Sequence, residues 1–302
     1  MRVILTYDVE NVGECVPKLR TVSKVHRGYE APITIFVTGL VIEEDGCELR
    51  RLLDEAPAMW DVNSHTYSHA RVICKPPWSL PVPSAEFIHE ETTRGVGVVR
   101  DRLDRPCRGF RPRSGAGAGF RGCLDNLNSL RSVGVLWTSA YLKSVFGDSL
   151  PGDLSGPFSY AADGFDEIIE MPGHGWQDCG VKDFGRGSQY AIRWPSPFAY
   201  PSRFVETPAE EFEVHRATLD AALAAKLPFC CFVMHPWTMI RRQDPDGKAI
   251  DLLLDYAKLR GCEFSTLDTE AQRCRENPQL LKPAPPVPPQ RTVNYDVGRI
   301  FA

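Results

Sequence analysis

The sequence predicts an α/β protein in which mostly parallel strands form a sheet covered by helices. Short apolar runs rich in β-branched and aromatic residues alternate with longer segments of mixed apolar and charged spacing, which is typical of βα units. Polar side chains directly follow several of these runs, as they do at the carboxyl ends of the strands of α/β barrels. A chain of 302 residues would be about two domains by length, but α/β barrels of this size form one. The pattern alone does not distinguish a barrel from an open sheet.

The expected strands are short, and each is a run of β-forming, mostly apolar residues. In chain order they cover residues 3–7, 31–38, 59–63, 107–111, 135–137, 167–171, 229–234 and 263–265. The run at 229–234 contains no polar residue. It therefore predicts a fully apolar strand, and the run at 3–7 predicts a buried one.

Helices are expected in the segments between these runs, where apolar and charged residues mix at helical spacing. They cover residues 15–28, 43–56, 84–103, a stretch between Gly119 and Gly134, and residues 207–225, 249–260 and 266–276. Ser84 suits an N-cap position. Thr207 also suits an N-cap, since Pro208 and acidic residues follow it in the first turn.

Three stretches show no regular pattern: residues 73–83, 139–164 and 177–207. An irregular stretch of this length in a compact domain is usually either functional or wrongly assigned. We expect part of the last one to wall a substrate cleft. Residues 282–289 are rich in proline, which predicts a stiff, extended segment. We therefore expect one domain at residues 1–278 and an extended tail at 279–302, which would dock on its own subunit or on a neighbouring one in a homo-oligomer.

The composition gives no sign of a nucleic-acid or membrane-surface partner, because the net charge is −4 and blocks of like charge are absent. The apolar run at 3–7 is too short for a signal-peptide core. No apolar stretch reaches the 18 residues of a candidate membrane span. We therefore expect a cytoplasmic protein without membrane insertion. Its ten cysteines, with no Cys-x-x-Cys pair, then indicate reduced thiols rather than metal ligands.

Two histidines four residues apart, His65 and His69, are the clearest candidates for metal ligands. At this spacing both imidazoles can turn to one side of a helical turn and bind one ion. The spacing alone is a weak signal. Three further segments strengthen it, because each places polar groups directly after a strand-like run: residues 6–10, 110–115 and 232–236.

In this order the four segments resemble the motifs of the polysaccharide deacetylase family, the NodB-homology or carbohydrate esterase family 4 hydrolases. That family has an aspartate motif at the first strand, a His-(Ser/Thr)-x-x-His motif, an arginine motif and a late Leu-x-His-like motif. Residues 65–69 match the second motif in full. The resemblance spans about residues 1–270 and implies a distorted (β/α) barrel with fewer than eight regular strands.

The resemblance also implies one divalent metal ion with three protein ligands, Zn²⁺ being favoured over Co²⁺, Ni²⁺ or Mn²⁺. His65 and His69 supply two of the ligands. The commonest family pattern has two adjacent aspartates, a base and then a ligand, but Val9 occupies the second position here. In another branch the second acid comes one residue later. That branch implies Asp8 as the general base and Glu10 as the third ligand, with Asp8 as the alternative third ligand.

Arg111 and His235 complete the implied catalytic set. By resemblance, Arg111 would hold the base carboxylate and keep it ionised; the alternative is an ordinary surface ion pair. His235 would be the general acid that protonates the leaving amine; the alternative is a core histidine with one hydrogen bond. An acidic residue usually orients this histidine, and the candidates are Asp178 and Asp183.

Candidate substrate-binding residues lie around these motifs. The family's Arg-Pro-Pro-Tyr-Gly motif appears here as residues 111–115, Arg-Pro-Arg-Ser-Gly. Backbone N–H groups near Arg113 and Ser114 would stabilise an oxyanion. Arg113 itself would meet an acidic substrate group or be an exposed structural arginine.

Aromatic residues after strands are a second set of candidates. Trp137, Trp176 and Trp237 would pack against a sugar ring, although such residues are often core. His174, in a Gly-rich turn, would line the cleft or only stabilise that turn.

The implied activity is metal-dependent hydrolysis of carbon–nitrogen bonds other than peptide bonds, in which Asp8 takes a proton from a metal-activated water. The expected substrate is an acetylated amino sugar or a related glycan precursor. The alternative within the superfamily is a small cyclic amide or imide, opened as allantoinases do. The alternative of another class is a non-catalytic carbohydrate-binding protein, because Val9 departs from the commonest motif.

Overall fold

A computed structural model describes residues 1–73, 83–143, 152–182, 204–241 and 244–287. The strands of this part form one sheet in the order β6-β7-β5-β4-β3-β2-β1-β8, with β9 paired to β1 beside β2. Neighbouring strands are parallel except for the antiparallel pair of β6 and β7. The strands are β1 Arg2–Val9, β2 Ile33–Val37, β3 Trp60–Ser64, β4 Gly109–Phe110, β5 Trp137–Thr138, β6 Phe158–Tyr160, β7 Phe165–Glu170, β8 Phe229–Met234 and β9 Glu263–Phe264.

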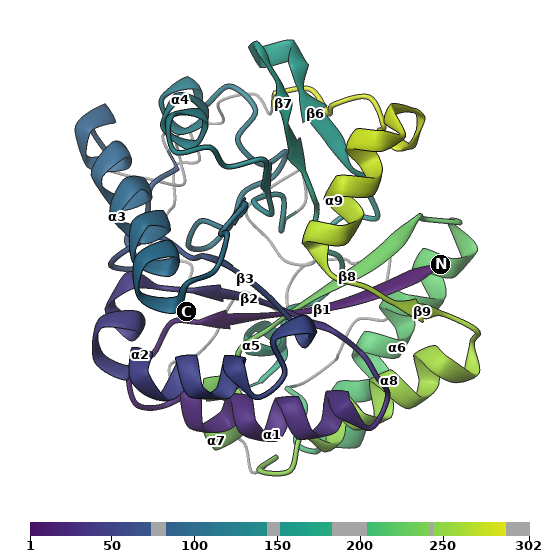
Figure 1. The fold of residues 1–302 in the computed structure, drawn as a ribbon. Coiled ribbons are helices and arrows are strands. Elements are labelled where there is room, and N and C mark those ends of the chain that lie inside the picture. Colours follow the sequence, from purple (N-terminus) through teal and green to yellow (C-terminus); the bar gives the residue numbers. More distant parts are fainter. Residues whose placement is uncertain (74–82, 144–151, 183–203, 242–243, 288–302) are drawn as a thin grey trace, which may run out of the picture.

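Helices cover the outside of the curved sheet (Figure 1). Around it, α4 packs on α3, α3 on α2, α2 on α1, α1 on α7 and α8, and α8 on α6. The α-helices are α1 Cys15–Arg27, α2 Gly39–Asp54, α3 Ala85–Leu103, α4 Leu124–Ser132, α5 Asp178–Val181, α6 Pro208–Ala224, α7 Pro236–Arg241, α8 Lys248–Leu259 and α9 Leu267–Glu276. Three single 3₁₀ turns lie at Pro57–Met59, Ala161–Asp163 and Pro278–Leu280.

The two edges of the sheet approach each other, so that it curls into a distorted barrel. After β7 the chain reaches β8, where the His174 backbone N–H donates to the Cys231 carbonyl at 2.8 Å. The Cys231 N–H in turn donates to Nδ1 of the His174 ring at 2.9 Å. A side chain therefore replaces part of the strand ladder at this seam. The predicted (β/α) barrel of mostly parallel strands is confirmed.

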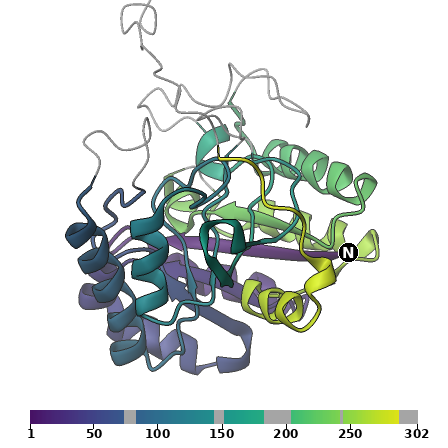
Figure 2. The same ribbon diagram turned by 90° about the horizontal axis from the view of Figure 1, so that it is seen from above.

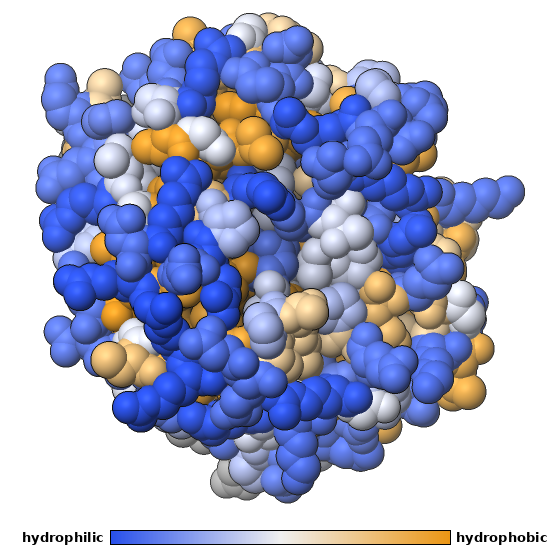
Figure 3. All heavy atoms as spheres, in the orientation of Figure 1, coloured by the Kyte–Doolittle hydropathy of each residue, from blue (hydrophilic) through white to orange (hydrophobic). Residues whose placement is uncertain are grey.

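The centre of the barrel is β1, which is buried from Val3 to Val9 and lies between β2 and β8. The buried strand predicted at 3–7 is thus confirmed, and all six residues of the apolar strand β8 are buried as well. The helices bury their apolar faces against these strands, and the face seen in Figure 3 is mainly hydrophilic. No helix among the described residues is both long and apolar enough to cross a membrane.

The structure differs from the expected elements in a few places. β1 continues two residues beyond the predicted strand at 3–7, so Asp8 lies within it. The stretches expected to be irregular contain β6 and the short helix α5. The helix α7, which begins at Pro236, was not predicted. Parts of the expected irregular stretches, residues 74–82, 144–151 and 183–203, lie outside the described residues.

The first residues of the expected tail lie along the barrel (Figure 2, yellow). The Lys282 N–H donates to the Pro157 carbonyl at 2.7 Å. Further on, the Arg121 guanidinium donates to the Pro285 carbonyl, and Val287 lies over Gly122. Residues 281–287 thus dock on their own subunit, and the domain boundary at residue 278 stays a prediction.

Candidate active site

The acids of the first motif lie at the end of β1. Asp8 and Glu10 are two residues apart, so their side chains leave the strand on the same side. Val9 between them points the other way, is fully buried and packs in the main hydrophobic core. Val9 therefore occupies a core position, and the spacing of Asp8 and Glu10 keeps two carboxylates on one side.

Glu10, His65 and His69 converge on one point. Oε2 of Glu10 lies 2.8 Å from Nε2 of His69 and 3.4 Å from Nε2 of His65. The ligand atoms of the three residues all lie within 4.8 Å of one another. Four tetrahedral ligands at the usual Zn–N and Zn–O distances are about 3.3 Å apart. The three donor atoms thus fit a single zinc-like ion.

The tautomer of His65 also suits metal binding. Its Nδ1 lies 2.9 Å from the carbonyl oxygen of Arg111. A carbonyl only accepts, so Nδ1 carries the proton and Nε2 presents its lone pair toward Glu10.

The histidine pair does not lie on a helical turn, contrary to the expectation from its spacing. β3 ends at Ser64, and the following loop contains two residues in the left-handed region, Thr66 (φ 66°) and His69 (φ 61°). The loop brings the two rings to a centroid distance of 5.0 Å. The ligands converge through this irregular backbone instead of through helical periodicity.

Two helices hold this loop. At the start of α2, the Gly39 N–H donates to the Thr66 carbonyl at 3.1 Å. On α3, Glu91 accepts hydrogen bonds from the Ser68 backbone N–H at 2.9 Å and hydroxyl at 2.8 Å. Gly95 of α3 is in such close contact that a Cβ there would lie 2.7 Å from the carbonyl carbon of Thr66. The loop conformation therefore depends on the packing of α2 and α3.

Trp237, the second residue of α7, orients Glu10. Its indole Nε1–H donates to Oε1 of Glu10 at 2.8 Å, which leaves Oε2 for the histidines. Burial raises the pKa of Glu10, but its contacts with the His65 and His69 rings and the nearby charge of His235 more than offset this, so the pKa falls well below its usual value. Glu10 is therefore a carboxylate suited to bind a cation.

Arg111 binds Asp8 in the interior of the protein. Its NH1 donates to Oδ1 of Asp8 at 2.7 Å and to the Thr6 hydroxyl at 2.8 Å, and its NH2 donates to the Ser139 hydroxyl at 2.9 Å. The guanidinium lies over the Phe36 ring, 4.0 Å from its centroid. Because Arg111 is fully buried, this is not a surface ion pair. It fixes the position of the Asp8 carboxylate.

The other oxygen of Asp8 lies between the histidine pair on one side and His235 on the other. Oδ2 is 3.7 Å from Nε2 of His65 and 3.7 Å from Nε2 of His235. Asp8 can therefore exchange protons both with a group held near the histidine pair and with His235.

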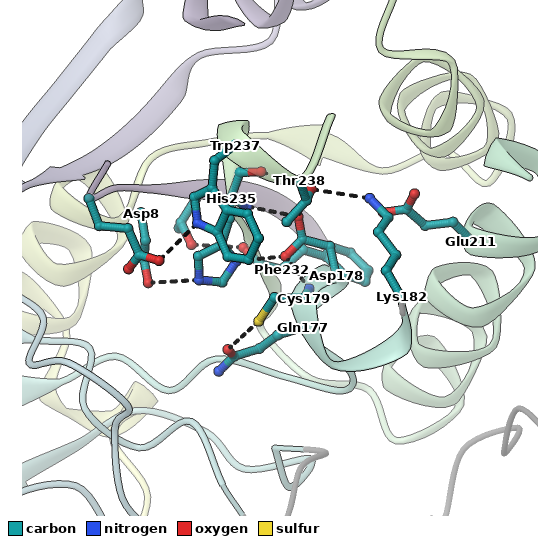
Figure 4. A network of polar contacts seen from close by, with 12 residues as sticks. Asp8, Gln177, Asp178, Cys179, Lys182, Glu211, Phe232, His235, Trp237 and Thr238 are labelled. Atoms are coloured by element: carbon teal, nitrogen blue, oxygen red, sulfur yellow. Dashed lines mark hydrogen bonds and ion pairs between the residues drawn. The ribbon is translucent and has the colours of Figure 1, made fainter. Parts of the chain in front are cut away.

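Asp178 is the acidic partner of His235 (Figure 4). Its Oδ1 lies 2.6 Å from Nδ1 of the ring, and its Oδ2 accepts the His235 backbone N–H at 2.8 Å. Of the two candidates from the sequence, Asp178 is thus in contact, and Asp183 lies outside the described residues.

The charges of this dyad support each other. Burial raises the pKa of Asp178, but the charge and hydrogen bonds of His235 outweigh it and lower the pKa to about 2. Burial lowers the pKa of His235, but Cys179 and Asp178 raise it well above its usual value. Because burial raises the pKa of the Cys179 thiol, the charge that acts at neutral pH is that of Asp178. The Asp178 carboxylate thus favours the protonated form of His235 and raises the pKa of this histidine.

Asp178, Cys179 and His235 also place three potential metal ligands within 4.8 Å of one another. However, Oδ1 of Asp178 accepts from the His235 ring and the Cys179 N–H, and Oδ2 accepts from the His235 N–H and the Thr238 hydroxyl. All of its lone pairs are in use. This group acts as a hydrogen-bonded dyad and not as a second metal site.

Two of the expected substrate contacts lie at the rim of the site. Arg113 and Ser114 are exposed, and NH1 of Arg113 donates to the His69 carbonyl at 3.3 Å. Ser114 has a left-handed backbone (φ 69°). Trp237 is half-buried and is in contact with the site through Glu10, a role that the sequence did not indicate.

The other candidates are buried, so the expectations that Trp137 and Trp176 pack against a sugar ring and that His174 lines the cleft are corrected. Trp137 and Trp176 are each only 1% exposed, and the Trp137 indole N–H donates to Asp268 at 3.0 Å. His174 is buried, and its Nε2 donates to the Ser155 carbonyl at 2.8 Å while its Nδ1 accepts from the barrel seam. A residue that is buried in this way cannot pack against a sugar ring.

A hollow of about 760 Å³ lies elsewhere, next to α9, and its lining includes Arg108, Asp268 and Gln272. Arg108 precedes β4, so this hollow is at the amino ends of the strands, whereas the site is at their carboxyl ends. It therefore plays no part in the chemistry considered for Asp8 and His235.

Comparison with known proteins finds a family model that matches part of the chain and solved structures that share its fold. Residues 1–121 match the family model described as "Polysaccharide deacetylase", and no curated protein matches the chain. Among solved structures, a putative polysaccharide deacetylase from Mycobacterium smegmatis is similar over 96% of this chain and 94% of its own, with a TM-score of 0.68 and 18% identity. Puue allantoinase is similar over 91% and 90%, with a TM-score of 0.61 and 10% identity.

A third similar structure is that of a CE4 family pseudoenzyme from Bacillus anthracis. The match covers 89% of this chain and 65% of that one, with a TM-score of 0.51 and 13% identity. At such identities the likeness to these structures establishes the shared fold alone. Since one of them is described as a pseudoenzyme, activity has to be argued from the residues of the site.

Proposed function

We propose that this chain, which belongs to the polysaccharide deacetylase family through residues 1–121, is a metal-dependent hydrolase of amide bonds other than peptide bonds. The observation that carries the proposal is the position of Asp8. Its carboxylate lies 3.7 Å both from a histidine of the Glu10–His65–His69 cluster and from His235. A base and an acid thus flank the place where an amide would react.

Glu10, His65 and His69 would hold the metal ion, with Zn²⁺ favoured and Co²⁺, Ni²⁺ or Mn²⁺ as alternatives. Two imidazoles and one carboxylate are a common ligand set of catalytic zinc. When bound, such an ion polarises a carbonyl oxygen and makes water acidic near neutral pH.

Asp8 is the general base in this proposal. It takes a proton from the attacking water while Arg111 holds the carboxylate in place through Oδ1. Oδ2, which faces both histidines, remains free for this proton transfer.

His235 is the general acid. Before the reaction, Asp178 stabilises the positive charge of the His235 imidazolium. As the amide C–N bond breaks, Nε2 of His235 donates its proton to the departing nitrogen. The products are a carboxylate and an amine. Asp8 then returns its proton to solvent or to His235, and the site is restored.

An acetylated amino sugar or related glycan precursor is the proposed substrate, in line with the family. Arg113 at the rim would meet an acidic group of this substrate, and backbone N–H groups near Arg113 and Ser114 would bind the oxyanion. A cyclic amide is the second candidate, supported by the similarity to an allantoinase. The non-catalytic alternative rested on Val9, which lies in the core and takes no ligand position away from the site.

The test is a metal analysis followed by product identification. Protein purified without added metal, and then reloaded with Zn²⁺, should hold one ion per chain, and both Glu10→Ala and His65→Ala should lose it. Retention of the ion in Glu10→Ala would make Asp8 the third ligand. The loaded protein should release acetate from an acetylated amino sugar; ring opening of a cyclic amide without acetate would establish the second candidate. A wild type that binds no metal would refute the proposal.

A further inference from the structure

A chain of buried polar groups continues from Asp178 away from the site (Figure 4). The Thr238 hydroxyl donates to Oδ2 of Asp178 at 2.7 Å. The ammonium group of Lys182 donates to the same hydroxyl at 3.2 Å and is paired with Oε1 of Glu211 at 2.8 Å. The Lys182 and Glu211 side chains are only 5% and 6% exposed. The buried ion pair between Lys182, directly after α5, and Glu211 of α6 is thus linked to the dyad through a single hydroxyl group.

A buried ion pair often adds no net stability, because the desolvation of two charges costs about as much free energy as their attraction provides. The presence of this pair is therefore better explained by a function than by stability. An apolar pair of similar volume would join the end of α5 to α6 at least as stably. What an apolar pair would not supply is a hydrogen-bond donor for Thr238. The position of Lys182 therefore points to a role at the site.

The direction of each hydrogen bond in this chain is fixed. An ammonium group only donates, so Lys182 occupies a lone pair of the Thr238 oxygen. The single hydroxyl proton must then point to an acceptor, and the two acceptors in contact are Oδ2 of Asp178 at 2.7 Å and the His235 carbonyl at 2.9 Å. In either case the hydroxyl is tied to the dyad, and the negative charge of Asp178 favours the bond to Oδ2.

We propose that Thr238 and Lys182, backed by Glu211, are positioning residues that hold Asp178 and thereby aim the His235 ring at Asp8. The inference rests on the proposed function, because His235 acts there as the general acid. With Oδ2 held by Thr238, the carboxylate plane is fixed and Oδ1 meets Nδ1 of His235 at 2.6 Å. This orientation places Nε2 at 3.7 Å from Asp8.

The charges around the dyad agree with this assignment. Besides burial, which acts in the opposite direction, His235 and Lys182 are the charges that lower the pKa of Asp178. Lys182 thus helps to keep the carboxylate ionised. The titratable groups that face this region from the neighbouring elements are Tyr7 and Asp8 of β1, Glu10 directly after β1, Cys179 of α5, Glu211 and His215 of α6, and Asp244 ahead of α8.

The sharpest test is a matched pair at Thr238 in the zinc-loaded protein. Thr238→Val keeps the shape and removes the hydroxyl, and it should lower kcat about 10- to 100-fold, a part of the 10²- to 10⁴-fold that a general acid contributes. KM and metal content should stay as in the wild type. Thr238→Ser restores the hydroxyl and should recover kcat to within about threefold. A merely structural role would change the melting temperature in Thr238→Val and leave kcat unchanged, which would overturn the proposal.

A second variant addresses the ion pair. Lys182→Met combined with Glu211→Gln removes both charges together, so neither is left alone in the interior. This double variant should lose kcat as Thr238→Val does, and adding Thr238→Val to it should cause little further loss, because the groups act through one link. Fully multiplicative losses would mean that Lys182 acts independently of Thr238 and would contradict the proposal.

A readout without substrate separates this inference from the proposed function. The short bond between Nδ1 of His235 and Asp178 should give a strongly downfield proton resonance in NMR spectra of the zinc-loaded wild type. The resonance should be lost or broadened by exchange in Thr238→Val and retained in Thr238→Ser. If the resonance behaves in this way while no amide is hydrolysed, the positioning holds and the proposed function fails. An unchanged resonance in Thr238→Val would refute the positioning.

Discussion

At the scale of single residues, the site depends on which way each side chain leaves its strand. Val9 stands where the commonest family motif has a metal-binding aspartate, yet it is fully buried and packs in the main core. Glu10, one residue later, faces the histidines instead. The second carboxylate of the motif is thus one position later in the sequence than in the commonest pattern. Because successive side chains of a strand point to opposite faces, Glu10 can reach the ligand position and residue 9 cannot.

We therefore predict that Val9→Asp will not improve metal binding. It places a charged group in the core without a partner and should lower the free energy of unfolding by about 3–5 kcal/mol. Val9→Ala, as the control, should cost about 2 kcal/mol for the two lost methyl groups. Urea denaturation measures both. Tighter zinc binding by Val9→Asp would show that position 9 faces the site.

Trp237 provides a second prediction at this scale. Its indole N–H orients Glu10, so Trp237→Phe should weaken zinc binding about 10- to 100-fold, as loss of an outer hydrogen bond to a metal ligand typically does. Competition with a chromogenic chelator gives the dissociation constant. An unchanged constant would mean that the histidines alone orient the Glu10 carboxylate.

At the scale of elements, the sequence predicted correctly those features that depend on neighbouring residues alone, such as helix caps and apolar strands. Ser84 and Thr207 cap α3 and α6 as predicted, each accepting a backbone N–H three residues on. The apolar run at 229–234 is β8 to the residue. The conformation of the histidine loop was not predictable, because contacts with α2 and α3 force its left-handed residues, and these contacts join segments far apart in the chain.

Two glycines of α3 offer a test of how much the loop depends on that helix. A Cβ at Gly95 would lie 2.7 Å from backbone of the loop, whereas a Cβ at Gly97 would have no atom within 4 Å. Gly95→Ala should destabilise the protein by about 1–3 kcal/mol through overpacking, and it should weaken zinc binding because His65 and His69 move.

Gly97→Ala is the matched control. Alanine in a helix interior is more favourable than glycine by up to about 1 kcal/mol, so this variant should be as stable as the wild type or more so, with unchanged zinc affinity. Calorimetric melting and chelator competition measure the two quantities. Equal behaviour of the two variants would show that α3 does not hold the loop.

At the scale of the whole molecule, the barrel is closed by contacts that no local pattern indicates. The segment after β7 meets β8 through His174 and Cys231, and Asp178 then meets His235. The sequence left two alternative roles open for His174 and gave Asp178 as one of two candidate partners of His235. The fold class and the motif residues were predictable because they lie at strand ends, whereas these partners follow from the curvature that brings the sheet edges together.

Two buried histidines, His174 at the seam and His26 of α1, should make the free energy of unfolding depend on pH. Burial lowers the pKa of His174 to about 4, and burial does the same for His26. In the unfolded chain both bind protons below a pKa of about 6.5. Stability is therefore complete above that value and is lost as the pH falls from about 6.5 to about 4.

Each histidine contributes on the order of 3 kcal/mol to this loss. His174→Gln should be less stable at pH 7 and should lose less of its stability between pH 7 and pH 4.5 than the wild type. Urea denaturation of the metal-free proteins at both pH values gives the two differences. Identical pH dependence in wild type and variant would mean that His174 is not buried in its neutral form.

The pairing of β1 with β8 also sets a time order for the growing chain. A nascent polypeptide that has emerged as far as residue 121 already contains Asp8, the three proposed ligands and Arg111, but its β1 has an open edge where β8 will later pair. The strand β8, which covers this edge, and the proton donor His235 are synthesised together, more than a hundred residues later. Until then the exposed edge can pair with strands of other chains. Early occupancy of the half-built site by an ion would stabilise β1 and its neighbours during this interval.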